Sequence, residues 1–166
     1  LKEARVLLIN GWGGTTGSST TDSDGCFSIS YSDTLQPTYP VTWTFRTELK
    51  RPGQFYVTDS WGALFTFSQE KTLNDSTESM GTLGVSGDRV FVYATSEEYW
   101  SNVVSASTRL STAMTNVRID AEMSGASSYT VNRGWVRIIN GRGQARPVSS
   151  VAHELGHASS FTCLDR

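Results

Sequence analysis

The spacing of apolar residues changes along this 166-residue chain, and that change constrains the fold more than any other feature. From Val41 to Thr47, apolar and polar side chains alternate, which predicts a strand with one buried face. From Tyr99 to Val117, apolar residues recur at helical spacing, which predicts a helix with one buried face. A change of period from two to that of a helix predicts an α+β protein made of two parts.

The first predicted part, residues 1–84, is rich in β-structure signals. Short segments of β-branched and aromatic residues are separated by Gly, Pro, Asp and Ser, as in a β-sandwich. The stretch Asn10 to Ser23 consists mostly of Gly, Ser and Thr, and this composition is too flexible for a part of the core. The residues Asp22 to Gly25 favour a tight turn, with a calcium loop as the alternative. The expected strands are 5–9, 26–31, 41–49, 54–58 and 63–68.

The second predicted part, residues 85–166, begins after a glycine-rich link at Thr82 to Gly87. Thr95 to Glu98 resembles a capping box, so we expect the long helix to begin there. Two strands over residues 117–123 and 134–140 should follow it. Gly141, Gly143 and Pro147 then break the chain before a last helix.

The only two histidines, His153 and His157, lie four residues apart around Glu154 in the motif HExxH. Four residues are about one helical turn, so both imidazoles share a helix face and can bind one zinc ion. The carboxylate between them can act as general base in amide hydrolysis. Gly156 is expected to let another backbone pass close to the site. A chance surface helix is the alternative, but an apolar stripe at helical spacing supports the metal site: Val148, Val151, Ala152 and Leu155.

From about Arg89 to Arg166, the chain resembles the N-terminal half of a zincin-type metallopeptidase catalytic domain. This resemblance implies a backing helix, a twisted sheet and an active-site helix, with His153 and His157 as zinc ligands and Glu154 as general base. It further implies a secreted zinc endopeptidase that acts on a peptide or protein substrate.

In that family the edge strand of the sheet binds extended substrate by strand addition. The implied strand consists of Trp135, Val136, Arg137, Ile138 and Ile139. The first part resembles transthyretin-like or carboxypeptidase-regulatory-like β-sandwich modules, on the turn and strand from Thr21 to Ile29.

A catalytic zinc normally has three protein ligands, and only two are evident. In the metzincin pattern HExxHxxGxxH, the third ligand falls on Cys163 and the glycine falls on Ser160, so both positions depart from the pattern. Cys163 could bind zinc, form a disulfide with Cys26, or remain a free thiol. Asp165 is a further candidate ligand. We expect the peptidase part to be incomplete at its C-terminus, with the third ligand in a region beyond this sequence.

Composition excludes two classes of partner. A net charge of −2 and the lack of a basic run argue against nucleic-acid binding. The longest apolar run, Val6 to Ile9, is far shorter than the roughly 20 residues of a membrane span. A composition rich in Ser, Thr, Gly and Trp, with Leu1 as first residue, favours a processed extracellular protein. The alternative function is an extracellular β-rich binding or structural protein with a degenerate, inactive peptidase half; the oligomeric state is not predicted.

Overall fold

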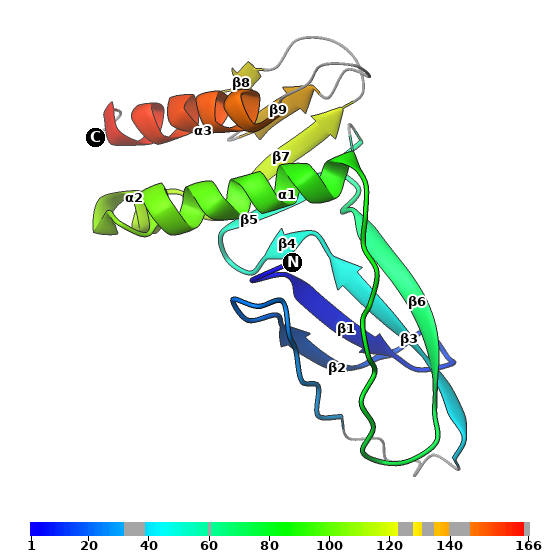
Figure 1. Ribbon diagram of the computed structural model, residues 1–166. Helices are drawn as coiled ribbons and strands as arrows, with labels where there is room; N and C mark the ends of the chain where they lie inside the picture. The colour runs from blue at the N-terminus through cyan, green and yellow to red at the C-terminus, as the bar shows by residue number, and fades with distance from the viewer. Residues whose placement is uncertain (32–38, 60, 123–127, 131–134, 140–146, 165–166) are drawn as a thin grey trace. The chain divides into compact units, whose positions relative to one another are not determined.

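The computed structural model describes residues 1–31, 39–59, 61–122, 128–130, 135–139 and 147–164. The chain forms two compact units, and each combines segments that are distant in sequence (Figure 1). The sheet unit comprises Leu1–Glu48 and Thr66–Val85, and the helix unit comprises Leu49–Phe65 and Ser86–Arg166. Strands and helices are both present, so the predicted α+β class is confirmed.

The sheet unit contains one four-stranded antiparallel sheet in the order β2-β1-β3-β6. Its strands are β1 (Arg5–Ile9), β2 (Thr15–Thr20), β3 (Val41–Glu48) and β6 (Thr66–Leu73). Alternation along β3 buries Trp43 and Phe45 on one face, as its sequence predicts. The core on that face consists of Val6, Leu8, Trp43, Phe45 and Leu73. Among the described residues this unit has a single sheet, so the two-layered sandwich stays a prediction.

One strand prediction for the sheet unit is wrong, and one strand of this unit was not predicted. Residues 26–31 form no strand, although Phe27, Ile29 and Tyr31 pack against the core. The stretch expected to lie outside the core contains β2, which pairs with β1 from Thr15 to Thr20 and has no buried residue. An edge strand is held by backbone hydrogen bonds to one neighbour, so β2 forms without large apolar side chains.

The tight turn predicted at Asp22 is confirmed and recurs at Asn10 and Asp59. The Asp22 Oδ1 atom accepts hydrogen bonds from the backbone N–H groups two and four positions later, at 2.9 and 2.8 Å. Asn10 and Asp59 make the same pair of bonds, and the residues two positions later, Trp12 and Trp61, are 94% and 92% exposed. These bonds show that the Asp22 side chain stabilises the turn, and the calcium loop stays a prediction.

The helix unit contains a five-stranded mixed sheet in the order β4-β5-β7-β9-β8. Strands β5, β7 and β9 are parallel, whereas β4 and β8 run antiparallel to their neighbours. The parallel pairing of β5 with β7 places residues 49–65 in this unit, although the predicted division put them in the first part. The strands are β4 (Lys50–Arg51), β5 (Phe55–Thr58), β7 (Val117–Glu122), β8 (Ser128–Thr130) and β9 (Trp135–Ile139).

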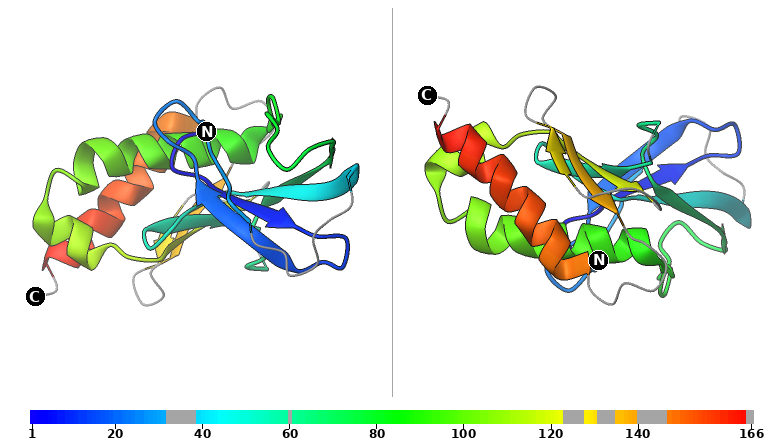
Figure 2. Two further views of the ribbon diagram at one scale, coloured as in Figure 1. Left: turned by 90° about the horizontal axis from the view of Figure 1, so that it is seen from below. Right: turned by 90° about the horizontal axis from the view of Figure 1, so that it is seen from above.

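Helices cover one face of this sheet. Helix α1 (Asp88–Tyr99) contacts β5, and helix α3 (Pro147–Leu164) contacts β8, β9 and α1 (Figure 2). Phe55 on β5 packs against Tyr93 and Trp100, with ring centroids 5.3 and 4.8 Å apart. These aromatic contacts form the centre of the core in the helix unit.

The first helix begins earlier than predicted. The expected capping residue Thr95 lies inside α1 and is buried. Glu97 is 2% exposed and forms an ion pair with Arg51 of β4 at 3.3 Å, so its carboxylate does not cap a helix end. The chain continues through a π-helical turn, η1 (Trp100–Val104), before the short helix α2 (Thr108–Ala113). The predicted single helix is therefore interrupted.

Strand β9 is not the edge strand that the resemblance implied. Arg118 of β7 pairs with Trp135 on one side, and Tyr129 of β8 pairs with Val136 on the other. The edge next to β9 is β8, a strand of three residues that was too short to be recognised in the sequence. The prediction that Trp135, Val136, Arg137, Ile138 and Ile139 form a free edge is therefore wrong.

Candidate metal centre

The HExxH motif lies in the middle of α3, which begins at Pro147 as predicted. One face of this helix is buried against the rest of the helix unit, whereas His153 and His157 are both exposed. No described atom lies within 4 Å of a Cβ placed on Gly156, so the expected close approach of a second backbone is not found there. The side chains that anchor the buried face are those of Val151, Leu155 and Ala158.

The two imidazole rings point toward the same position in the solvent. Their Nε2 atoms are 3.0 Å apart, and the rings are edge to face with centroids 4.6 Å apart. Two nitrogens that are each about 2.1 Å from a tetrahedral zinc ion lie about 3.4 Å apart, so His153 and His157 fit two positions on one ion. The same distance also fits an N–H···N hydrogen bond between two neutral rings. Small rotations of the side chains interconvert the two arrangements.

Glu154 follows His153 in the chain and is buried. Its relative exposure is 7%, whereas both histidines are exposed. A carboxylate that is partly shielded from bulk solvent and adjacent in sequence to a metal ligand can exchange a proton with water near that metal.

Ser159, two residues beyond His157, fixes α3 to its neighbours. Its Oγ donates to the Leu155 carbonyl oxygen at 2.9 Å and lies 2.9 Å from the Tyr99 hydroxyl of α1. The Met114 sulfur is 3.1 Å from the same Oγ. The hydroxyl is buried, so these bonds replace contacts with water and hold the histidine-bearing turn against α1.

The described residues do not supply a third metal ligand: no group of three His, Cys, Asp or Glu side chains able to hold an ion is found there. Asp165 and the side chain of Cys163 lie outside the described part. Cys163 and Asp165 as zinc ligands therefore stay predictions.

The predicted disulfide stays a prediction. Cys26 is an exposed, free cysteine in the sheet unit. Its proposed partner, Cys163, belongs to α3, and its side chain is outside those described.

A buried polar cluster at the ends of β5 and β7 was missed in the sequence. Asp120 is 1% exposed and accepts hydrogen bonds on Oδ1 from Arg118 Nε and from the Thr58 hydroxyl. Its Oδ2 atom has no hydrogen-bond partner among the described residues. The signal was present, because charged residues alternate with the apolar Val117 and Ile119 along β7. Their burial became evident only once the sheet was assembled.

The chain has no match among protein-family models, curated proteins or solved structures. The helices within the described ranges include none long and apolar enough to cross a membrane. The case for a function therefore depends on the geometry of this chain alone.

Proposed function

We propose that this chain contributes the active-site helix of a zinc-dependent endopeptidase. The observation that carries the proposal is the 3.0 Å separation of the His153 and His157 Nε2 atoms on the exposed face of α3. Glu154 is adjacent to His153 in the chain. Two converging imidazoles on a helix that also carries a glutamate between them support metal-assisted amide hydrolysis.

Each residue has a distinct role in this proposal. His153 and His157 bind zinc through Nε2, so each ring carries its proton on Nδ1. Zinc supplies Lewis-acid polarisation of the scissile carbonyl and makes water more acidic. The Glu154 carboxylate accepts a proton from the attacking water and delivers it to the leaving amine nitrogen. The third ligand is proposed to lie outside the described residues.

The substrate strand is proposed to pair with β8. This strand lies at the edge of the mixed sheet, antiparallel to β9, and α3 contacts both strands. A peptide added to β8 would be held extended by main-chain hydrogen bonds, next to the helix that carries the histidines. In this proposal β8 replaces β9 as the strand that binds the substrate.

The proposal also includes the detailed fold of each unit. The backing helix α1, the mixed sheet and α3 support a zincin-type arrangement of the helix unit. The antiparallel sheet unit supports a β-sandwich-like module beside it. Secretion is proposed on the composition and on the resemblance.

Hydrolysis of an unstructured protein such as casein tests the proposal. Zinc-loaded protein should cleave casein, and Glu154→Gln should lower the rate about a hundredfold or more, because it removes the general base. The matched control is Glu98→Gln, which removes an exposed carboxylate on α1 and should leave the rate unchanged. Equal rates for Glu154→Gln and Glu98→Gln would remove Glu154 from the mechanism.

The alternative is a binding or structural protein with a degenerate peptidase half. The lack of a third ligand among the described residues favours it. The two functions differ in metal affinity. Stoichiometric zinc at nanomolar free metal supports the enzyme, whereas zinc that is lost in the micromolar range supports the alternative.

A further inference from the structure

The outer face of the antiparallel sheet, opposite the core of the sheet unit, is rich in hydroxyl groups. Side chains alternate between the two faces of a strand, so the register of the sheet shows which residues share the outer face. Its central residues, Leu7 and Ile9 of β1, are only 6% and 5% exposed, so this face offers no apolar patch. The exposed side chains on it include Thr15, Ser18, Thr20, Thr42, Ser68 and Thr72.

The Trp12 turn and a pair of threonines lie at one end of this face. Strand β1 ends at Ile9, which is paired with Thr44 of β3. Thr42 is two residues from Thr44 in the direction of the turn, and it is paired with Thr72 of β6. Thr42 and Thr72 therefore lie on the face of Ile9, at the end of the sheet where the turn connects β1 to β2 (Figure 1).

The two threonines keep hydrogen-bonding capacity for a ligand. The Oγ1 atoms of Thr42 and Thr72 are 3.0 Å apart, and both side chains are exposed. A hydroxyl has one donor and two acceptor positions, so one bond between the two groups leaves one donor and three acceptor positions. Every residue from Asn10 to Thr21 is also uncharged. This end of the sheet therefore suits a neutral ligand that itself has many hydroxyl groups.

Trp12 presents an indole ring on a turn of fixed geometry. The residue is 94% exposed. Asn10 Oδ1 accepts hydrogen bonds from the backbone N–H groups of Trp12 and Gly14 at 3.1 and 2.9 Å, which stabilises the turn. A Cβ on Gly11 or Gly13 would meet no atom within 4 Å, so the residues next to Trp12 leave room beside its ring. The negative face of an aromatic ring attracts the partly positive C–H groups of a sugar ring.

We infer that this end of the sheet unit binds a neutral, β-1,4-linked polysaccharide. Such a chain is an extended ribbon whose sugar rings have C–H groups on their faces and hydroxyl groups at their edges. One sugar ring stacks on Trp12, and hydroxyl groups of neighbouring sugars form hydrogen bonds with Thr42 and Thr72. The lack of an apolar patch disfavours a protein partner, and a single ring is too little for stable attachment to a lipid surface. This site does not involve the histidine pair.

Co-sedimentation with insoluble polysaccharides tests the inference. The full chain is mixed with microcrystalline cellulose or with chitin, which share the β-1,4 linkage and differ in the sugar. Saturable binding to at least one of them is expected, and the comparison shows which sugar is preferred. No saturable binding to either polysaccharide in large excess would overturn the inference. Phosphatidylcholine vesicles are the third probe, and binding to vesicles alone would identify a lipid surface and would also overturn it.

Two tryptophan variants separate a specific site from adsorption of any exposed ring. Trp12→Ala should weaken polysaccharide binding about tenfold or more, because the stacked ring is lost. The matched control is Trp61→Ala, since Trp61 is 92% exposed on the same kind of turn but belongs to the helix unit. This control should leave the affinity unchanged. If the two variants bind equally well, whether weakened or not, the inference is wrong.

Removal of the two hydroxyl groups locates the rest of the site. Thr42→Val combined with Thr72→Val keeps the β-branched shape that suits a strand and should weaken binding about fivefold or more. The matched control is Thr66→Val, an exposed position on the same face of β6 at the other end of the sheet, which should not change the affinity. Circular dichroism checks that each variant is folded. A double variant that binds as tightly as the wild type would overturn the inference.

Discussion

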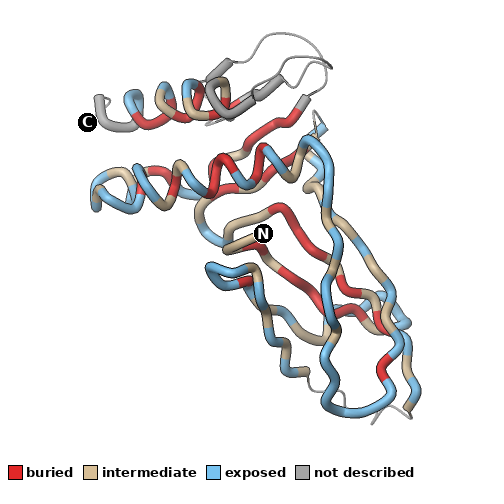
Figure 3. The backbone as a smooth tube through the Cα atoms, viewed as in Figure 1, coloured by how far each residue is buried: buried red, intermediate tan, exposed pale blue. Residues whose placement is uncertain are grey.

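The two units cover their sheets in different ways. In the helix unit, α1 and α3 cover the mixed sheet, and Phe55, Val57 and Ile119 are completely buried (Figure 3). In the sheet unit, irregular segments cover the antiparallel sheet, and Phe27 and Met80 on those segments are only half-buried. A helix satisfies its own backbone hydrogen bonds, so it can pack closely on a sheet and leave no open rim.

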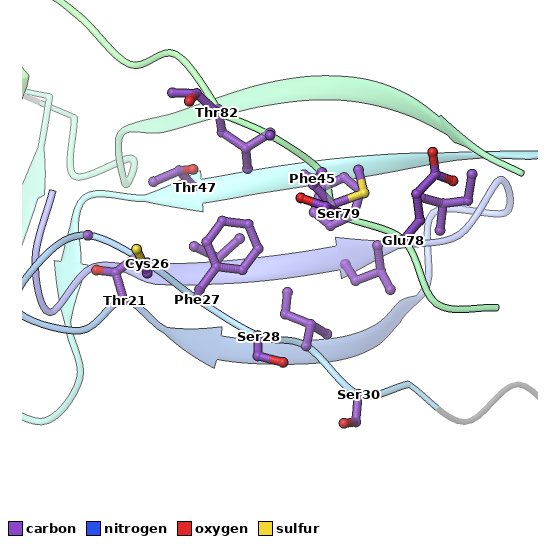
Figure 4. Close-up of a pocket in the computed structure, with 18 of the residues that line it drawn as sticks. Thr21, Cys26, Phe27, Ser28, Ser30, Phe45, Thr47, Glu78, Ser79 and Thr82 are labelled. Carbon is purple, nitrogen blue, oxygen red and sulfur yellow. The ribbon is translucent and has the colours of Figure 1, made fainter. Parts of the chain in front are cut away.

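This difference bears on the proposed metal centre. Close packing in the helix unit holds the histidine-bearing turn of α3 in one position, as the proposed catalysis would require. The sheet unit instead contains a cavity of about 1060 Å³ (Figure 4). The following predictions compare how closely the two sheets are covered.

The largest effect is expected for Trp100→Ala in the helix unit. Trp100 is 1% exposed and packs on Phe55, so removing its ring should lower the free energy of unfolding by about 4 kcal/mol. Urea denaturation measures the change. A loss below about 1 kcal/mol would mean that this core is not closely packed.

Asp120→Ala should have the next largest effect. The substitution removes the ion pair with Arg118, whose side chain is 12% exposed, and should destabilise the protein by about 3 kcal/mol. The double variant Asp120→Leu with Arg118→Met should recover much of that loss, because no buried charge remains. The exposed control Glu98→Ala should change stability by less than about 0.5 kcal/mol. A double variant as unstable as Asp120→Ala would contradict this explanation.

Phe27→Ala should have a smaller effect in the sheet unit. Its ring is half-buried, so about half of the free energy of a buried phenylalanine, about 1.5 kcal/mol, should be lost. The same urea experiment provides the measurement. A loss of stability as large as that of Trp100→Ala would show that the two sheets are covered equally closely.

Gly156→Ala should give the smallest change and the opposite sign. The position is inside α3 and a Cβ there meets open space, so alanine should stabilise the protein by about 1 kcal/mol. Thermal denaturation should show a higher midpoint with unchanged zinc affinity. Destabilisation would indicate that another part of the protein packs against this position.

The sequence predicted those elements whose structure follows from the pattern of their own side chains. The alternation in β3 and the histidine spacing in α3 are local, and both elements were found where expected. Strand β2 was missed because its backbone pairing leaves no apolar pattern. The wrong assignment of β9 as an edge had a different cause, since the order of strands depends on contacts between distant segments.

The start of α1 shows the same limit within a helix. Thr95 to Glu98 looked like a capping box in the sequence, but Thr95 lies inside α1, and Glu97 in the same stretch pairs with Arg51, a residue 46 positions earlier. A local motif cannot show such a partner. For the candidate site, the sequence supplied His153, Glu154 and His157, whereas the convergence of the two Nε2 atoms and the shielding of Glu154 required the structure.

Zinc affinity of the two histidine variants tests the central claim most directly. Competition with a chromophoric chelator should show one tightly bound zinc per chain in the wild type. His153→Ala and His157→Ala should each weaken binding about a hundredfold or more, because each removes one ligand from the same ion. The chain has no other histidine, so none can substitute. Zinc affinity that is unchanged in both variants would contradict the proposal that these two imidazoles form a metal centre.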